Sequence, residues 1–116
     1  MRFSVDRVNR PWGWYENLYD NSTYKIKRLC VNPNEQISLQ YHKLRNEHWI
    51  VVEGNGKIII GEDVKNVSIG DYIFVPVEYK HRISSGDCGI IIIEVQQGSS
   101  CIEEDIVRIE DNYGRI

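Results

Sequence analysis

The stretch "ISLQYHKLRNEHWIVVEGNGKIIIG", residues 37–61, holds the clearest signals for the fold. Its apolar segments are short and rich in β-branched residues, as β-strands are. Between two of them, "EGNGK" is typical of a hairpin turn, because Gly and Asn tolerate a positive φ. We therefore expect a strand on each side of residues 53–57.

The same alternation of apolar segments and turn residues continues along most of the chain. Strands are predicted at "YKIKRLCV", "ISLQYH", "HWIVVEG", "KIIIG", "YIFVP", "HRISS" and "IIIIEVQ". Turns are predicted in "NPNEQ", "EDVKNVSIGD" and "GDCG". A strand every 8–12 residues or so indicates an all-β sandwich or small barrel. The tail "CIEEDIVRIEDNYGRI" fits either a short helix or an edge strand.

Composition narrows the class of protein. A chain of 116 residues with 41% hydrophobic and 27% charged residues suits one globular domain with a modest core. The net charge of −3 argues against general binding to nucleic acid. The amino terminus lacks the apolar segment of a secretory signal, and the run from Ile90 is too short to span a membrane. Cysteines 30, 88 and 101 contain no CxxC pair, which predicts reduced thiols and a cytoplasmic protein.

Side chains with metal-ligand chemistry lie along the opening stretch. Residues two apart on a strand share a face, so Ser38, Gln40 and His42 point together. That face can also be the solvated edge of the strand. On the next strand Glu47 shares a face with large apolar residues, and a carboxylate buried there needs a metal ion or an arginine as partner. His48 points the opposite way and is predicted to be structural.

A fourth candidate ligand, His81, begins a later strand. With Gln40, His42 and Glu47 it supplies O, N, O and N donors, a mixture that suits zinc, cobalt, manganese or iron. Without cysteine ligands, such a site leaves coordination positions for water or substrate. The residues therefore predict a site for one divalent metal ion.

The spacing of these residues resembles the two cupin motifs. In the first, over residues 34–54, Gln40 and His42 occupy the positions of an H-x-H pair and Glu47 follows as the carboxylate. In the second, over residues 70–85, His81 occupies the histidine position. The resemblance implies a single cupin domain over residues 1–116, folded as a double-stranded β-helix, or jelly-roll, barrel.

Three further positions depart from the cupin pattern. Asn34 and Glu78 stand where the motifs have glycine, and Ser85 stands where the second motif ends in asparagine. These are turn or end positions, so we expect the departures to leave the ligand geometry intact.

Longer phrases resemble one family more closely. "RPWG", "LQYHKLRNEHW", "IEVQQG" and "DNYGR" look like the type II mannose-6-phosphate isomerase domain. In many bacteria that domain forms the C-terminus of a mannose-1-phosphate guanylyltransferase, and glutamine is usual in it at the position of Gln40. The resemblance runs from about Arg10 to Arg115. Nothing resembles the glycine-rich nucleotide loop of the transferase, so we expect a stand-alone isomerase cupin rather than an excised domain.

The resemblance implies a metal-dependent interconversion of mannose 6-phosphate and fructose 6-phosphate through an enediol. Zinc is the first candidate for the metal. Contacts to the sugar phosphate are expected from cationic or polar side chains. Arg45 ranks first and Arg82 lower, because Arg82 directly follows His81 and would point away from it. The expected substrate-binding residues are Arg45, Ser38, Lys27, Arg82 and Arg10.

The general base is expected to be Glu94, which sits in the apolar "IIIIEVQ" where burial raises a carboxyl pKa. An outward position on an edge strand is the alternative for this residue. Two other functions stay open: a non-catalytic sugar-phosphate-binding or regulatory cupin, and an iron cupin oxygenase, for which Gln40 is a poor ligand. A homodimer is expected by analogy with small cupins, and the family's product feeds nucleotide-sugar and polysaccharide synthesis.

Overall fold

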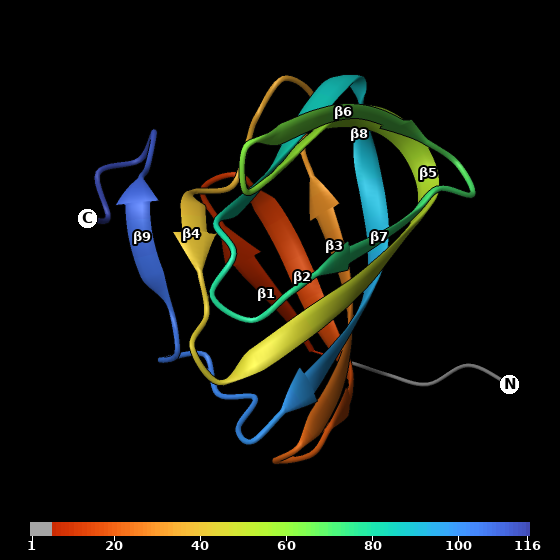
Figure 1. The fold of residues 1–116 in the computed structure, drawn as a ribbon. Helices are drawn as coiled ribbons and strands as arrows, with labels where there is room; N and C mark the ends of the chain where they lie inside the picture. The colour runs from red at the N-terminus through yellow and green to blue at the C-terminus, as the bar shows by residue number, and fades with distance from the viewer. Residues whose placement is uncertain (1–5) are drawn as a thin grey trace, which may run out of the picture.

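The computed structural model describes residues 6–116, which form strands and turns with no helix among them. The strands are β1 (Arg7–Arg10), β2 (Gly13–Asp20), β3 (Tyr24–Val31), β4 (Leu39–Tyr41), β5 (Arg45–Ile60), β6 (Asp63–Ser68), β7 (Tyr72–Val75), β8 (His81–Gly98) and β9 (Val107–Glu110). They pair in the order β1-β2-β3-β8-β4-β9, while β5 pairs with β6, β7 and β8. The sheet curls round on itself (Figure 1), which confirms the predicted all-β barrel.

The first five residues of the predicted domain lie outside the described part of the chain. The boundaries at residues 1 and 116 stay a prediction. No helix among residues 6–116 is long and apolar enough to cross a membrane. The three cysteines are free thiols: Cys101 is buried, Cys30 is partly buried and Cys88 is exposed.

The long strands β5 and β8 run antiparallel along most of their lengths and form the longest strand pairing of the barrel. Because β5 continues through residues 53–57, the hairpin turn predicted there is wrong. Register shifts on both sides of Gly54 mark bulges, which bend the strand without ending it. A Cβ at Gly54 would lie 2.0 Å from the carbonyl oxygen of Gly89, so the glycine allows the two bent strands to approach each other.

The same pairing corrects one other predicted turn. "GDCG" lies inside β8, which runs unbroken because β5 accompanies it on both sides of the bulges. The segment "EDVKNVSIGD" does hold a turn, closed by the hydrogen bond from Asp71 N to Ser68 O at 3.1 Å, and before it lies β6, which pairs with the second half of β5. The tail, which the sequence left open between helix and strand, forms the edge strand β9 against β4. The element boundaries therefore depend on long-range pairing rather than on local turn residues.

The core fills the inner face of the curled sheet. Trp49 and Ile58 of β5 are fully buried, as are Ile83 and Ile92 of β8. Alternate residues face outward, so Ile50 is 46% exposed while its neighbours point inward. This parity places Glu47, two residues before Trp49, on the inner face as predicted.

Two departures from the cupin pattern now have a conformational explanation. Asn34 has φ 60° and Glu78 has φ 69°, the left-handed conformation in which glycine is the usual residue. Glu78 is the third residue of a turn closed by the hydrogen bond from Tyr79 N to Pro76 O, 3.2 Å. Its own amide donates to the carbonyl of His42 at 2.8 Å, which ties this turn to the start of the site. At both positions the backbone adopts the left-handed conformation usual for glycine, although neither residue is a glycine.

Replacement of Gly54 by alanine is expected to lower the free energy of unfolding by about 2–5 kcal/mol, because it adds left-handed strain to a backbone clash. The matched control is Gly70→Ala. Gly70 also has a positive φ, 92°, but nothing lies within 4 Å of its added Cβ. Gly70→Ala should lower the free energy of unfolding only by the left-handed strain, about 1–2 kcal/mol. Urea denaturation measures both, and equal losses would contradict the close approach at Gly54.

Candidate metal centre

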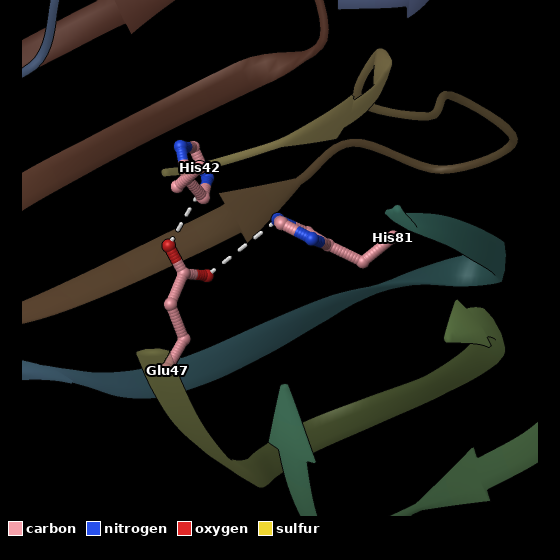
Figure 2. A group of neighbouring side chains, drawn as sticks. All are labelled: His42, Glu47 and His81. Carbon is pink, nitrogen blue, oxygen red and sulfur yellow. Dashed lines mark ion pairs between the residues drawn. The ribbon is translucent and has the colours of Figure 1, made fainter. Parts of the chain in front are cut away.

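Three side chains converge at one end of the barrel interior. His42 follows β4, Glu47 lies on β5 and His81 begins β8. The Glu47 carboxylate lies between the two imidazoles and points one oxygen toward each (Figure 2). Its Oε2 lies 3.2 Å from His42 Nε2, and its Oε1 lies 3.8 Å from His81 Nε2. One donor atom from each residue lies within 4.8 Å of the others, and all three residues are buried.

Both imidazoles are held in the form that a metal ligand requires. His42 Nδ1 donates to the backbone carbonyl of Asp105 at 2.6 Å, and His81 Nδ1 donates to that of Tyr79 at 2.9 Å. A carbonyl only accepts, so Nδ1 carries the proton and Nε2 presents its lone pair to the cluster. Burial lowers the pKa of His42 to about 4 and also lowers the pKa of His81, so both rings are neutral near pH 7.

Two features of the cluster suit a bound cation. His81 Nε2 is buried without a hydrogen-bond partner among residues 6–116. A buried nitrogen lone pair without a partner costs free energy, and a bound cation would supply that partner. Burial acts to raise the pKa of Glu47, but the charges of His81 and His42, protonated at the low pH where this carboxyl titrates, and of Arg45 outweigh it and hold the pKa well below its usual range. A carboxylate and two neutral imidazole nitrogens suit a divalent ion.

Gln40 lies beside this cluster. It pairs with His81 between β4 and β8, and its Nε2 lies 3.3 Å from His42 Nε2. Its Oε1 accepts a hydrogen bond from Ser38 Oγ at 2.6 Å. A half-turn of the amide would present Oε1 to the cluster and leave Nε2 to donate to the serine, since a hydroxyl also accepts. Ser38 is buried and its hydroxyl helps to hold the Gln40 amide, while its contact with a substrate stays a prediction.

The cluster opens into a cavity lined by both charges and aromatic rings. Five cationic side chains reach it, and the aromatic ones include Trp12 and Tyr15. The cationic residues are Arg10, Lys27, Arg45, Arg108 and Arg115.

Three of these cations already have carboxylate partners. Arg45 Nε donates to Glu47 Oε2 at 3.0 Å, and Lys27 contacts Glu103. Arg115 is paired with Asp111. Arg10 and Arg108 make no ion pair among residues 6–116: Arg10 donates to Asn9 O and Tyr15 Oη, and Arg108 Nε is buried without a hydrogen-bond partner.

Of the predicted substrate contacts, Arg82 is not part of this cavity. Its Nε donates to the carbonyl of Ile37 at 2.9 Å and its other nitrogens reach Glu110, so it joins β8 to β9. His48 faces outward and hydrogen-bonds Tyr72 and Gln97. The guanidinium of Arg82, predicted as a substrate contact, is instead taken up by Ile37 and Glu110.

Glu94 lies on the inner wall of the cavity and is 5% exposed, which removes the outward alternative. Its Oε2 accepts from Trp49 Nε1 at 3.2 Å, and its Oε1 accepts from Gln96 Nε2 at 2.5 Å. The same indole nitrogen donates to Glu47 Oε1 at 3.1 Å. Burial and the nearby Glu47 charge raise the pKa of Glu94 to about 8.

Sequence reasoning missed several residues of the site. Gln96 is fully buried on the same face as Glu94, and its Oε1 has no partner among residues 6–116. The signal that could have identified Gln96 is its position two residues after Glu94, which places both side chains on the same face of the strand. Arg108, Glu103 and Asp105 belong to a tail whose fold the sequence left open, so their positions were not predictable.

A curled antiparallel barrel with buried histidine and carboxylate donors at one end defines the class: this is a cupin. A cupin-2 domain from Rhodospirillum rubrum superposes with a TM-score of 0.77 at 16% identity, over 90% of this chain and 81% of that one. At that identity the likeness confirms the fold alone.

The chain belongs to the family described as "Mannose-6-phosphate isomerase C-terminal", whose model matches residues 3–111. It is 39% identical over 110 residues to a mannose-1-phosphate guanylyltransferase from Salmonella typhimurium, covering 94% of this chain and 23% of that protein. It is 41% identical over 110 residues to a xanthan biosynthesis protein from Xanthomonas campestris, covering 94% and 24%. The chain therefore spans about a quarter of the length of these relatives.

Proposed function

We propose that this chain is a metal-dependent isomerase that interconverts mannose 6-phosphate and fructose 6-phosphate. The observation that carries the proposal is the buried cluster of His42, Glu47 and His81 at the end of a cavity lined by cations, in a chain of this family. The reaction moves a proton between two neighbouring carbons of a sugar phosphate. It needs a cation at the sugar oxygens, a base and an anion site, and the cavity offers candidates for each.

His42, Glu47 and His81 would hold the divalent ion, with Gln40 as the fourth ligand. Zinc is the first candidate, and cobalt, manganese and iron suit the same donors. When bound, the ion supplies Lewis-acid stabilisation of negative charge that develops on the sugar oxygens. Arg45 Nη2 lies 3.3 Å from His42 Nε2, so its guanidinium lies at the edge of the same space and can orient a substrate oxygen there.

Glu94 is the best-placed base among the cavity carboxylates. Glu47 is held by Arg45, and Glu103 is held by Lys25 and Lys27. The hydrogen bonds to Glu94 come from the neutral donors Trp49 and Gln96. A base within an ion pair must give up that pairing to accept a proton, whereas Glu94 can accept one while keeping its indole contact.

The phosphate is assigned to Arg10 and Arg108, with Arg115 beside them. Burial lowers the pKa of Arg108, and the positive charges of Arg115 and Arg10 act in the same direction, against Asp111. Arg108 Nε is buried without a hydrogen-bond partner among residues 6–116. A phosphate dianion would supply that partner and relieve the repulsion among the arginines.

Replacement of Arg108 by alanine is expected to raise KM for mannose 6-phosphate about tenfold to a hundredfold, with a smaller change in kcat, because it removes a charged hydrogen bond made throughout the reaction. The matched control is Arg28→Ala. Arg28 binds Glu16 and does not line the cavity, so KM should stay within about twofold. Steady-state kinetics measure both, and equal KM values for Arg108→Ala and the unchanged protein would remove Arg108 from the phosphate site.

The proposed function itself is tested by a coupled assay that follows fructose 6-phosphate formation from mannose 6-phosphate. The protein is loaded in turn with zinc, cobalt, manganese and ferrous iron, and chelated protein is the control. Turnover that requires a metal supports the proposal. Tight binding of mannose 6-phosphate without turnover under all four metals would instead assign a non-catalytic sugar-phosphate-binding role.

A further inference from the structure

The turn between β4 and β5 carries one proposed metal ligand and leads directly into the strand that carries another. It consists of His42, Lys43 and Leu44. Such a turn presents free backbone N–H groups, and an unpaired group beside a buried site is costly. Here both amides after the histidine are satisfied from a distant part of the chain, residues 101–106, which we term the C-terminal segment.

Asp105 of this segment makes three hydrogen bonds to the turn. Its Oδ1 accepts from the amide of Lys43 at 3.0 Å, and its Oδ2 accepts from that of Leu44 at 2.9 Å. Its backbone carbonyl accepts from His42 Nδ1 at 2.6 Å. The carboxylate therefore holds the backbone on one side of the histidine, while the carbonyl of the same residue holds its ring.

The C-terminal segment reaches the site a second time. Arg45 Nη1 donates to the carbonyl of Ile102 at 3.0 Å. The amide of Asp105 donates back to that same carbonyl at 3.2 Å, which closes a tight turn over residues 102–105. The turn over residues 102–105 therefore positions two carbonyl groups at once. That of Ile102 accepts from Arg45, and that of Asp105 accepts from His42.

We propose that Asp105 is a positioning residue for the metal centre, whose side chain holds the 42–44 turn so that its carbonyl can fix the ring of His42 with Nε2 facing Glu47. This inference rests on the proposed metal-dependent function. It differs from a purely structural role because it predicts a change in the His42 ring and in metal affinity while the barrel stays folded. Partners that orient a ligating histidine typically contribute tenfold to a hundredfold in metal affinity.

The test compares Asp105→Ala and Asp105→Asn with the unchanged protein. Three readouts are taken on the full chain: ¹⁵N shifts of the His42 ring without metal, hydrogen exchange of the Lys43 and Leu44 amides, and the Kd for Zn²⁺ by competition with a chromophoric chelator. In Asp105→Ala we expect about tenfold faster exchange at both amides and a loss of the single Nδ1–H form. We also expect a Kd for zinc raised about tenfold to a hundredfold. Asp105→Asn keeps one acceptor oxygen and should fall between.

The matched control is Glu104→Ala, because Glu104 is the exposed neighbour in the same segment. It should leave all three readouts unchanged. Asp105→Ala protein with the zinc affinity and ring form of the unchanged protein would overturn the inference, as would equal effects of the two alanine variants. If Asp105→Ala does not fold, Asp105→Asn decides by the same criteria. Unchanged protein that binds zinc through His42 without isomerising substrate would overturn the proposed function and leave this inference standing.

Discussion

Protein in which His42 and His81 are both replaced by alanine is expected to carry no bound metal and to lose at least about a thousandfold in kcat/KM for mannose 6-phosphate. The two imidazoles are the neutral nitrogen donors of the cluster, and Glu47 with Gln40 would retain only oxygen donors. Without the ion, charge on the sugar oxygens would lose several kcal/mol of stabilisation, which is a factor of this size. Elemental analysis after dialysis against zinc measures the metal, and the coupled assay measures the activity.

His48→Ala is the matched control for this double replacement. His48 is the remaining histidine of the chain, adjacent to Glu47 but on the outer face, where it contacts Tyr72 and Gln97. Its replacement should leave metal content and activity unchanged. Circular dichroism and thermal unfolding establish that each variant is folded. A folded double variant that binds as much metal as the unchanged protein would mean that the ion binds elsewhere.

The directions of Glu47 and His48 show which part of the site the sequence could predict. Parity along a strand depends only on backbone geometry, so the inward direction of Glu47 and the outward direction of His48 followed from their positions relative to Trp49. His81 was a candidate because of its donor chemistry at the start of a later strand, and the resemblance to the second cupin motif supported that choice. The structure brings it within 4.8 Å of the other donors, although the two histidines are far apart in sequence.

Other parts of the site depend on contacts that no local pattern encodes. "EGNGK" has the composition of a turn, yet pairing with β8 draws it into one bent strand. Asp105 and Arg108 reach the site only because β9 adds to β4 as an edge strand. A short polar tail gives no sign of which edge it will join, because the energy of that choice comes from partners elsewhere in the chain. The place of Arg108 in the proposed anion site and the contacts of Asp105 with residues 42–44 were therefore beyond prediction.

Glu94→Gln is expected to lower kcat about a hundredfold to ten-thousandfold, the usual contribution of a general base, while metal content and KM change little. The replacement is nearly isosteric. Its amide oxygen can still accept from Trp49, and Gln96 can turn its unpartnered Oε1 toward the new amide group, so the wall of the cavity is kept. The loss should therefore appear in the proton transfer and not in binding.

Isotope exchange makes this last expectation specific to a base. Mannose 6-phosphate carrying deuterium at C2 loses its label to water when a base removes that atom, and Glu94→Gln should slow the loss as much as it slows kcat. Two carboxylates serve as controls: Glu53→Gln on β5 lies outside the cavity, and Glu103→Gln lies within it but begins in an ion pair. Neither should slow label loss more than a few-fold, because neither reaches the sugar carbon as a free base. Label loss slowed by Glu103→Gln but not by Glu94→Gln would move the base to Glu103, on the side of the cavity held by Lys25 and Lys27.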